Sequence, residues 1–259
     1  MVDFERKKRY GFEDLLRIMK ILRAPDGCMW DQEQDHHSIR RNFIEETYEA
    51  VEAIDNEDSE LLKEELGDVL LQVVFHAEIE SEKGVFDITD VADGVCKKLI
   101  FRHPHIFGDT KVSSTGEILK NWDNLKQTEK HQQTAADTLD SVARSLPALI
   151  RADKVLSKAA KIGFDWDGVG GALSKVHEEL HELEAAIQGQ GNPAEELGDL
   201  LLAAAGVARF IGCDPEQCTA QSCEKFISRF RKLEILAGDK PLGEMTLDEL
   251  SALWQTAKQ

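Results

Sequence analysis

The sequence predicts an all-α protein built from two similar helical-bundle domains in tandem. Three observations carry this prediction. Long segments place apolar residues at three- and four-residue spacing, strand patterns are almost absent, and a set of motifs occurs twice in the same order. A chain of 259 residues has room for two domains of ordinary size.

The expected helices follow from this spacing and from a high content of Leu, Ala and Glu. In the first half they cover residues 43–56 and 61–82, and in the second half residues 175–188 and 194–211. Gly189-Gln-Gly191 predicts a turn, Asn192 a helix cap and Pro193 a first helical position. We therefore expect each half to contain an antiparallel helical hairpin with flanking helices.

Each half carries, in one order, a Trp-Asp pair, a glutamate cluster, a Glu-Leu-Gly-Asp motif, a basic pair and a tryptophan followed by a lysine. In the first half these are Trp30-Asp31, Glu45-Glu46-x-x-Glu49, Glu65-Leu-Gly-Asp68, Lys98 with Arg102, and Trp122 with Lys126. In the second half they are Trp166-Asp167, Glu178-Glu179-x-x-Glu182, Glu196-Leu-Gly-Asp199, Lys225 with Arg229, and Trp254 with Lys258. The repeat predicts domains at 1–130 and 146–259, joined by a linker at 131–145.

Charge and cysteine content limit the partners and the location. The 49 acidic and 31 basic residues give a net charge of −18, which argues against nucleic-acid and anionic-membrane partners. The longest apolar run, Leu200 to Ala208, is too short to span a bilayer. Residues 1–12 carry basic side chains but no apolar stretch typical of a signal peptide. Together with five cysteines, an odd number, this predicts a cytoplasmic protein with reduced thiols.

The repeated carboxylates indicate a metal site. Glu179 and Glu182 lie three residues apart and so share one helical face, as do Glu196 and Asp199 on the next helix. If these faces meet across the hairpin, four carboxylates repel one another unless divalent cations bind between them. Oxygen ligands favour Mg²⁺, with Mn²⁺ as the alternative. The first-half equivalents are further metal candidates: Glu46, Glu49, Glu65 and Asp68.

A site of this kind points to a phosphate-ester substrate, because Mg²⁺ usually shares phosphate oxygens with its substrate. Lys225 and Arg229 share one helical face and suit phosphate binding, while Trp254 suits stacking on a base, with Lys258 one turn further on. Packing is the alternative role for Trp254. The first-half candidates for nucleotide binding are Lys98, Arg102, Trp122 and Lys126.

Two glycines lie inside the expected helices, next to the candidate ligands. Gly67 and Gly198 occupy equivalent positions in the two Glu-Leu-Gly-Asp motifs. Glycine costs about 1 kcal/mol relative to alanine in a helix. We therefore expect each glycine to allow the close approach of a helix or of a ligand.

The motifs resemble those of the MazG family of nucleoside triphosphate pyrophosphohydrolases, in its long two-domain bacterial form. Besides the doubled glutamate motifs, the resemblance rests on Gly27-Cys-Met-Trp-Asp31, Arg102-His-Pro-His-Ile-Phe107, Ser145-Leu-Pro-Ala-Leu149, Gly163-Phe-Asp-Trp-Asp167 and Lys225-Phe-x-x-Arg229-Phe. It implies an all-α homodimer that hydrolyses NTP to NMP and diphosphate by attack at the α-phosphorus.

The resemblance also implies which residues act. Glu179, Glu182, Glu196 and Asp199 would be the catalytic ligands of Mg²⁺, and the C-terminal domain would carry most of the activity. We expect a broad range of ribo- and deoxyribonucleotide substrates and a role in nucleotide-pool housekeeping or regulation. Asn192 departs from the family pattern, in which members can carry a phosphate-contacting lysine at this position.

Other interpretations stay open. Cys213, Cys218 and Cys223 are evenly spaced, but no CxxC motif or His partner accompanies them, which argues against a zinc site. Glu178-x-x-His181 matches half of a di-iron motif, but the sequence has no second Glu-x-x-His pair to complete it. The main alternative belongs to another class: a helical dimer that senses nucleotides or binds a regulatory protein partner, with slow or vestigial hydrolysis. The duplication favours it, because one copy is free to lose catalysis and keep ligand binding.

Overall fold

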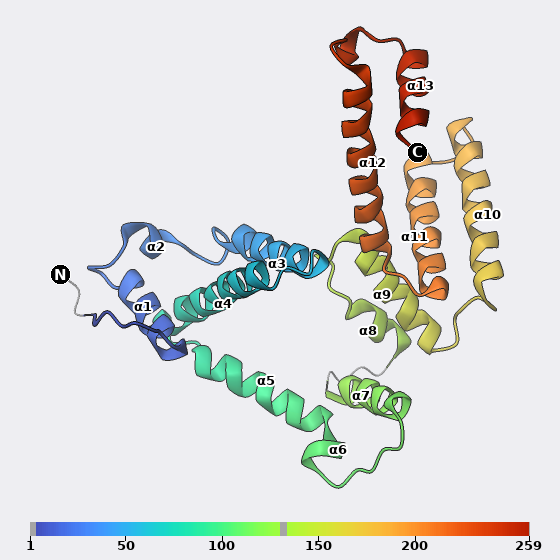
Figure 1. Ribbon diagram of the computed structural model, residues 1–259. Helices are drawn as coiled ribbons and strands as arrows, with labels where there is room; N and C mark the ends of the chain where they lie inside the picture. Colours follow the sequence, from blue (N-terminus) through green and yellow to red (C-terminus); the bar gives the residue numbers. More distant parts are fainter. Residues whose placement is uncertain (1–3, 130–133, 259) are drawn as a thin grey trace. The chain divides into compact units, whose positions relative to one another are not determined.

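The computed structural model describes residues 4–129 and 134–258, and within these ranges the regular structure is entirely helical (Figure 1). The predicted all-α class is confirmed. The first helices are α1 Phe12–Arg23, α2 Met29–Glu33, α3 Arg40–Asp55, α4 Ser59–Glu82, α5 Ile88–Arg102, α6 Pro104–Phe107 and α7 Thr115–Glu129. They are followed by α8 Ala135–Asp140, α9 Ala148–Lys161, α10 Val169–Ile187, α11 Pro193–Ile211, α12 Pro215–Ala237, the short 3-10 turn η1 Leu242–Glu244 and α13 Leu247–Ala257.

The chain divides into two compact units, residues 1–125 and 126–259, and the division falls inside α7. The domain limits 1–130 and 146–259 remain a prediction. Of the predicted linker, residues 131–133 lie outside the described residues, and the remaining part contains α8.

The four helices expected from the sequence are present as α3, α4, α10 and α11. The predicted start of α11 is confirmed, because the Asn192 side chain accepts a hydrogen bond from the Ala194 amide at 3.1 Å and Pro193 is the first helical residue. Gly189 and Gly191 turn the chain just before it with φ angles of 94° and 149°, which other residues rarely adopt. Local sequence signals therefore fix this hairpin connection.

Each unit is organised around one antiparallel helical hairpin, α3–α4 or α10–α11, whose helices lie side by side (Figure 1). The short connections force each pair to run antiparallel. In the first unit, Phe75 and Val74 of α4 pack with Met19, Ile39 and Ile79 in the core. In the second unit, small side chains occupy much of the buried surface of the hairpin, and they let the two helices pack closely. These are Ala172 and Ala186 of α10 and Ala203, Ala205 and Ala208 of α11.

The expected close approach of a helix to Gly67 and Gly198 is wrong for the described residues, whereas the approach of a ligand stays a prediction. A Cβ atom added at Gly67 or at Gly198 would meet no other part of the described structure within 4 Å. Within residues 4–129 and 134–258, no helix therefore approaches these glycines closely. Helical spacing shows which residues share a face, but it does not show whether anything covers that face.

The longest apolar run of the sequence lies in α11, where it packs against α9 and α10. Throughout the described ranges, no helix has both the length and the apolar character needed to cross a membrane.

Candidate metal centre

Carboxylates of the second unit converge between α10 and α11. One oxygen from each of Glu179, Glu196 and Asp199 lies within 4.8 Å of the others. Glu179 comes from α10 and is only 5 % exposed, while Glu196 and Asp199 come from the first two turns of α11. The hairpin therefore brings together residues that lie 17 or more positions apart in the sequence.

The fourth predicted ligand, Glu182, also belongs to this neighbourhood. Burial raises the pKa of Glu196, and the negative charges of Glu182 and Asp199 raise it further. The elevated pKa thus reflects burial first and repulsion between the carboxylates second. The predicted acidic cluster is thus a structural fact, although its role as a metal ligand set remains a prediction.

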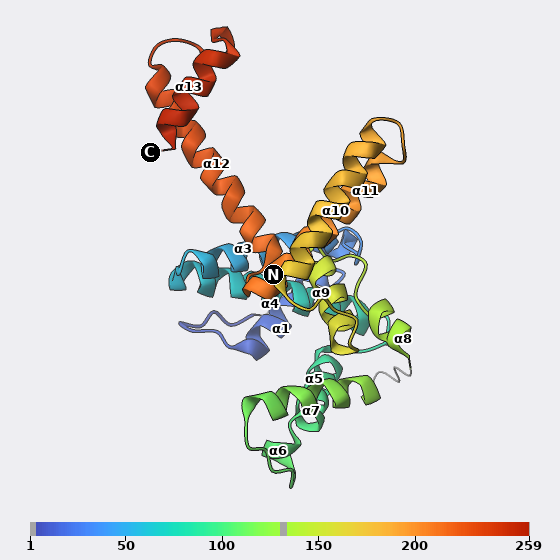
Figure 2. The same ribbon diagram turned by 90° about the vertical axis from the view of Figure 1, so that its right-hand side faces the viewer.

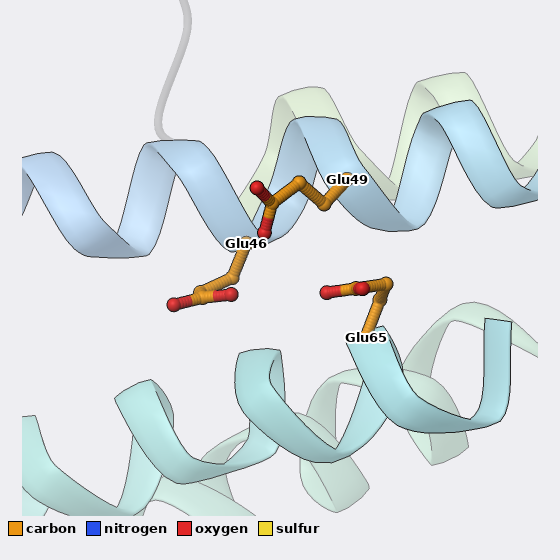
Figure 3. Close-up of side chains that lie close together, drawn as sticks. All are labelled: Glu46, Glu49 and Glu65. Carbon is orange, nitrogen blue, oxygen red and sulfur yellow. The ribbon is translucent and has the colours of Figure 1, made fainter. Parts of the chain in front are cut away.

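The first unit repeats the arrangement between α3 and α4. Glu46, Glu49 and Glu65 each place an oxygen within 4.8 Å of the others, and Figure 3 shows Glu46 and Glu65 extending into the space between the two helices while Glu49 lies along α3 with its carboxylate toward Glu46. Burial raises the pKa of both Glu46 and Glu65. The negative charge of Asp68 raises the pKa of Glu46 further, and the negative charges of Glu49 and then Asp68 raise that of Glu65. The equivalents of all four second-unit carboxylates therefore gather here as well.

The two clusters differ in one charged residue. In the second unit, Lys175 Nζ lies 2.6 Å from Glu179 Oε1 and 2.7 Å from Glu178 Oε1. Hydrogen bonds to Glu178 and then to Glu179 raise the pKa of Lys175, which keeps it cationic. Alignment of the glutamate motifs places Asn42 at this position in the first unit. Lys175 was not predicted from the sequence, although its position four residues before Glu179 on one helix was the available signal.

The donor set fits a hard divalent cation. Both groups consist of carboxylate oxygens, which suit Mg²⁺, Mn²⁺ or Ca²⁺ rather than a soft metal. Among the described residues, no group of three containing cysteine or histidine is placed to share a metal, so the zinc and di-iron hypotheses find no site. All five cysteines carry free thiols.

A cavity of about 460 Å³ adjoins the second cluster. Its lining combines the acidic cluster with an apolar wall and an ion pair, and it consists of Leu156, Phe164, Asp165, Trp166, Lys175, Glu179, Asp199, Leu202, Ala203 and Arg209. In the sequence, Trp166 was noted as part of the repeat and, with Phe164 and Asp165, as part of a family-like motif, but neither these residues nor Arg209 were predicted as site residues. Their convergence depends on how α11 meets the segment before α10, which no local pattern encodes.

The predicted phosphate- and base-binding residues of the second unit belong to α12, to α13 and to the residue that follows α13. Lys225 is exposed and Arg229 half-buried on α12, while Trp254 of α13 packs against Phe226 with ring centroids 4.9 Å apart. Lys258 follows α13 and donates to Gln255 Oε1 at 3.1 Å. Figure 2 shows the α12–α13 hairpin diverging from α10–α11. Within the described chain, none of these four predicted residues lines the cavity.

Of the equivalent residues in the first half of the sequence, Arg102 and Trp122 pack against each other. Arg102 is buried with its guanidinium over the Trp122 ring, 5.9 Å from the centroid, and the His103 ring meets the same tryptophan edge-on at 4.7 Å. Lys98 is exposed on α5, and Lys126 lies on α7 with its side chain partly covered. Trp122 therefore has a packing role in this structure, and nucleotide binding by these four residues stays a prediction.

The fold and the site indicate a class of protein: an all-helical protein whose helical hairpins carry carboxylate clusters suited to divalent cations. The family follows from comparison with known sequences. The MazG nucleotide pyrophosphohydrolase domain matches residues 34–107, the segment that contains α3 to α6. Together with relatives that are similar over nearly the whole chain, this shows that the chain belongs to the MazG family of nucleotide pyrophosphohydrolases.

Two named relatives match nearly end to end. A Thermotoga maritima protein named nucleoside triphosphate pyrophosphohydrolase/pyrophosphatase MazG is 42% identical over 249 residues, 95% of either chain. The nucleoside triphosphate pyrophosphohydrolase of Escherichia coli K12 is 41% identical over 253 residues, 95% of this chain and 96% of its own. Bacillus subtilis YabN, an uncharacterized protein, is 41% identical over 98% of this chain and 53% of its own. The resemblance inferred from the motifs is confirmed.

The raised pKa of Glu196 predicts a pH-dependent stability. A folded-state pKa above the unfolded value of about 4.5 means that the folded chain binds the proton more tightly, so this group destabilises the fold as pH rises through the raised pKa. In EDTA, Glu196→Gln is therefore expected to raise Tm at pH 7.5 relative to the unsubstituted protein, and to do so less at pH 4.5. Thermal unfolding followed by circular dichroism measures both differences. An equal Tm change at the two pH values would contradict the repulsion.

Proposed function

We propose that this chain hydrolyses nucleoside triphosphates to nucleoside monophosphates and diphosphate with Mg²⁺, and that Mn²⁺ can replace it. The observation that carries the proposal is the cluster of Glu179, Glu196 and Asp199 beside a cavity. Relatives that are 41–42% identical over nearly their whole length are named for this activity. Glu182 completes the proposed catalytic set.

The chemistry assigns distinct tasks to the residues around the cluster. A divalent cation held there would neutralise the triphosphate and lower the pKa of a bound water. The carboxylates orient that water toward the α-phosphorus. As the water oxygen bonds to this phosphorus, one of the carboxylates would take the water's proton, the bond from the α-phosphorus to the bridging oxygen would break, and diphosphate would leave. Lys175 pairs with Glu179 and lines the same cavity, and it would contact the phosphates once a cation compensated the carboxylates.

We assign most of the activity to the second unit. Its cluster adjoins the cavity and carries the cation Lys175, whereas Asn42 stands at the equivalent first-unit position. The first-unit carboxylates Glu46, Glu49, Glu65 and Asp68 remain candidates for an additional or structural metal site. A broad range of ribo- and deoxyribonucleotides, a role in the nucleotide pool and a cytoplasmic location complete the proposal.

The remaining nucleotide-binding residues are proposed to come from a second copy of the chain. Lys225, Arg229, Trp254 and Lys258 belong to a hairpin that diverges from α10–α11 (Figure 2), so they stand apart from the carboxylates of their own chain. Large apolar side chains are exposed on both hairpins, and such surfaces typically mark protein interfaces. They include Leu180, Ile187, Leu197, Leu201, Phe226 and Phe230. A homodimer would cover these side chains and supply the cations.

The equivalent glutamates of the two units provide a matched pair of variants. Glu196→Gln is expected to reduce diphosphate release by at least about 100-fold, because metal-ion catalysis contributes several kcal/mol. Glu65→Gln, at the same position of the first unit, is expected to retain most of the turnover. A diphosphate-release assay with Mg²⁺ measures both.

Three results of this assay would revise the proposal. Loss of turnover in Glu65→Gln would overturn the assignment of activity to the second unit, and full activity of Glu196→Gln would overturn the role of the cluster. An unsubstituted protein that binds nucleoside triphosphates without releasing diphosphate would favour the nucleotide sensor.

Mixed dimers test whether the cations come from the second copy. Glu196→Gln and Arg229→Ala are each expected to be inactive alone. If the residues act across the dimer, an equal mixture after subunit exchange regains about one quarter of the activity, because half of the dimers then hold one intact site. No recovery in dimers shown to contain both variants would place both residues of a site in one chain.

A further inference from the structure

Two histidine rings of the first unit are hydrogen-bonded to each other. His36 lies in the segment between α2 and α3, and His76 lies on α4. Their Nδ1 atoms are 2.7 Å apart, and the two rings stack with centroids 5.0 Å apart and 9° between their planes. The other ring nitrogen of His36, Nε2, lies 2.6 Å from Oε1 of Glu80, one turn further along α4. His36 therefore attaches its segment to α4 through two hydrogen bonds.

These hydrogen bonds limit the number of protons that the two rings can hold. A carboxylate only accepts, so His36 Nε2 carries a hydrogen and donates it to Glu80. Between the two Nδ1 atoms one nitrogen must donate and the other must accept. One positive charge fits this pattern, because a protonated His36 donates to His76 and to Glu80 at once. When both rings are protonated, two N–H groups face each other and the bond between the histidines is lost.

The surroundings of His76 oppose its protonation. Burial lowers the pKa of His76, and the positive charge of His36 lowers it further. From α3 the ring meets only the uncharged Phe43, with centroids 5.6 Å apart. From α4, Lys83 Nζ lies 2.7 Å from Glu80 Oε1, and hydrogen bonds from Lys83 and then His36 lower the pKa of Glu80. The histidine pair thus faces one carboxylate that stays ionised, and the second proton enters only in acid.

The attached segment, residues 24–39, has a second anchor on its other side. Arg23, at the end of α1, donates from Nη1 to the backbone oxygens of Asp31 and Gln34 at 2.5 and 3.2 Å. Its Nε lies 2.6 Å from an oxygen of Glu82 on α4. A guanidinium keeps its charge in folded proteins, so its bonds to backbone oxygens persist in acid. The histidine anchor is the one that a change of pH can release.

We propose that His36, His76 and Glu80 form a pH-sensitive clasp, which holds the α2 segment on α4 at neutral pH and releases it when both rings are protonated. Arg23 keeps the segment attached near its start, so α2 detaches while the α3–α4 hairpin stays folded. The released part includes Trp30, which is already 57 % exposed. This inference concerns the first unit and is independent of the proposed function.

The clasp is specific to the first unit. Alignment of the two Glu-Leu-Gly-Asp motifs places Val207 at the position of His76 and Ile211 at the position of Glu80. Neither residue titrates or hydrogen-bonds through its side chain. The second unit therefore provides an internal reference that does not share this response to pH.

The direction of the effect follows from the lowered pKa of His76. A folded-state pKa below the ordinary value of 6.5 means that the clasped form binds the proton less tightly than the released form. The clasp therefore contributes its full stability above about pH 6.5 and loses it as pH falls through the lowered pKa.

Hydrogen exchange of the full chain, followed by mass spectrometry at pH 7.5 and 5.5 and corrected for the intrinsic exchange rates, tests the clasp. Protection of residues 24–39 is expected to fall by at least about fivefold at pH 5.5, the loss of one hydrogen bond. His76→Gln, whose side chain does not titrate, is expected to show equal protection at the two pH values. His37→Gln, next to His36 but exposed, is the matched control and keeps the fall.

Three results would overturn the clasp: equal protection of the unsubstituted protein at the two pH values, a fall in His76→Gln as large as in the control, or an equal fall in α9 of the second unit, which would indicate global unfolding. If His76→Gln leaves the segment unprotected at both pH values, NMR titration of the histidine rings in His36→Gln decides. A His76 pKa higher than in the unsubstituted protein supports the coupled pair, and an unchanged pKa overturns it.

Discussion

Repulsion between converging carboxylates is the constraint on which this structure depends. The α10–α11 hairpin holds Glu179, Glu196 and Asp199 within 4.8 Å of one another, and burial with mutual repulsion raises the pKa of Glu196. Such a cluster lowers the stability of the free protein. The close packing of the alanine-lined hairpin and the ion pair of Lys175 with Glu179 offset this loss. The proposed cation would convert the same repulsion into binding free energy.

Two copies of one helical hairpin have diverged through a few side chains. Both keep the carboxylates, but Asn42 replaces Lys175 and Phe75 replaces Gly206 when the motifs are aligned. The first change removes a cation beside the acidic cluster. The second fills the place where the second unit seats a tryptophan. Both differences favour the second unit as the place of nucleotide chemistry, while the retained carboxylates leave the first unit equipped for a metal.

The sequence predicted those parts of the structure that depend on local periodicity. Residues three apart share a helical face, and the Asn192 cap and the glycine turn close the hairpin, so the carboxylate clusters followed from spacing. The cavity did not, because Trp166 meets Gly206 only through the packing of distant segments. The expected approach of a helix to Gly67 and Gly198 was wrong for the same reason, because a glycine inside a helix does not reveal what lies opposite it, and the approach of a ligand stays a prediction.

The central claim, that the α10–α11 carboxylates bind a divalent cation, is tested most directly by electron paramagnetic resonance of Mn²⁺ added to the protein without nucleotide. The account predicts that the unsubstituted protein depletes free Mn²⁺. The first-unit double variant, Glu65→Gln with Asp68→Asn, keeps the Mn²⁺ binding of the second unit. Adding Glu196→Gln and Asp199→Asn to it abolishes this remaining binding. Undiminished Mn²⁺ binding after substitution of all four residues would contradict it.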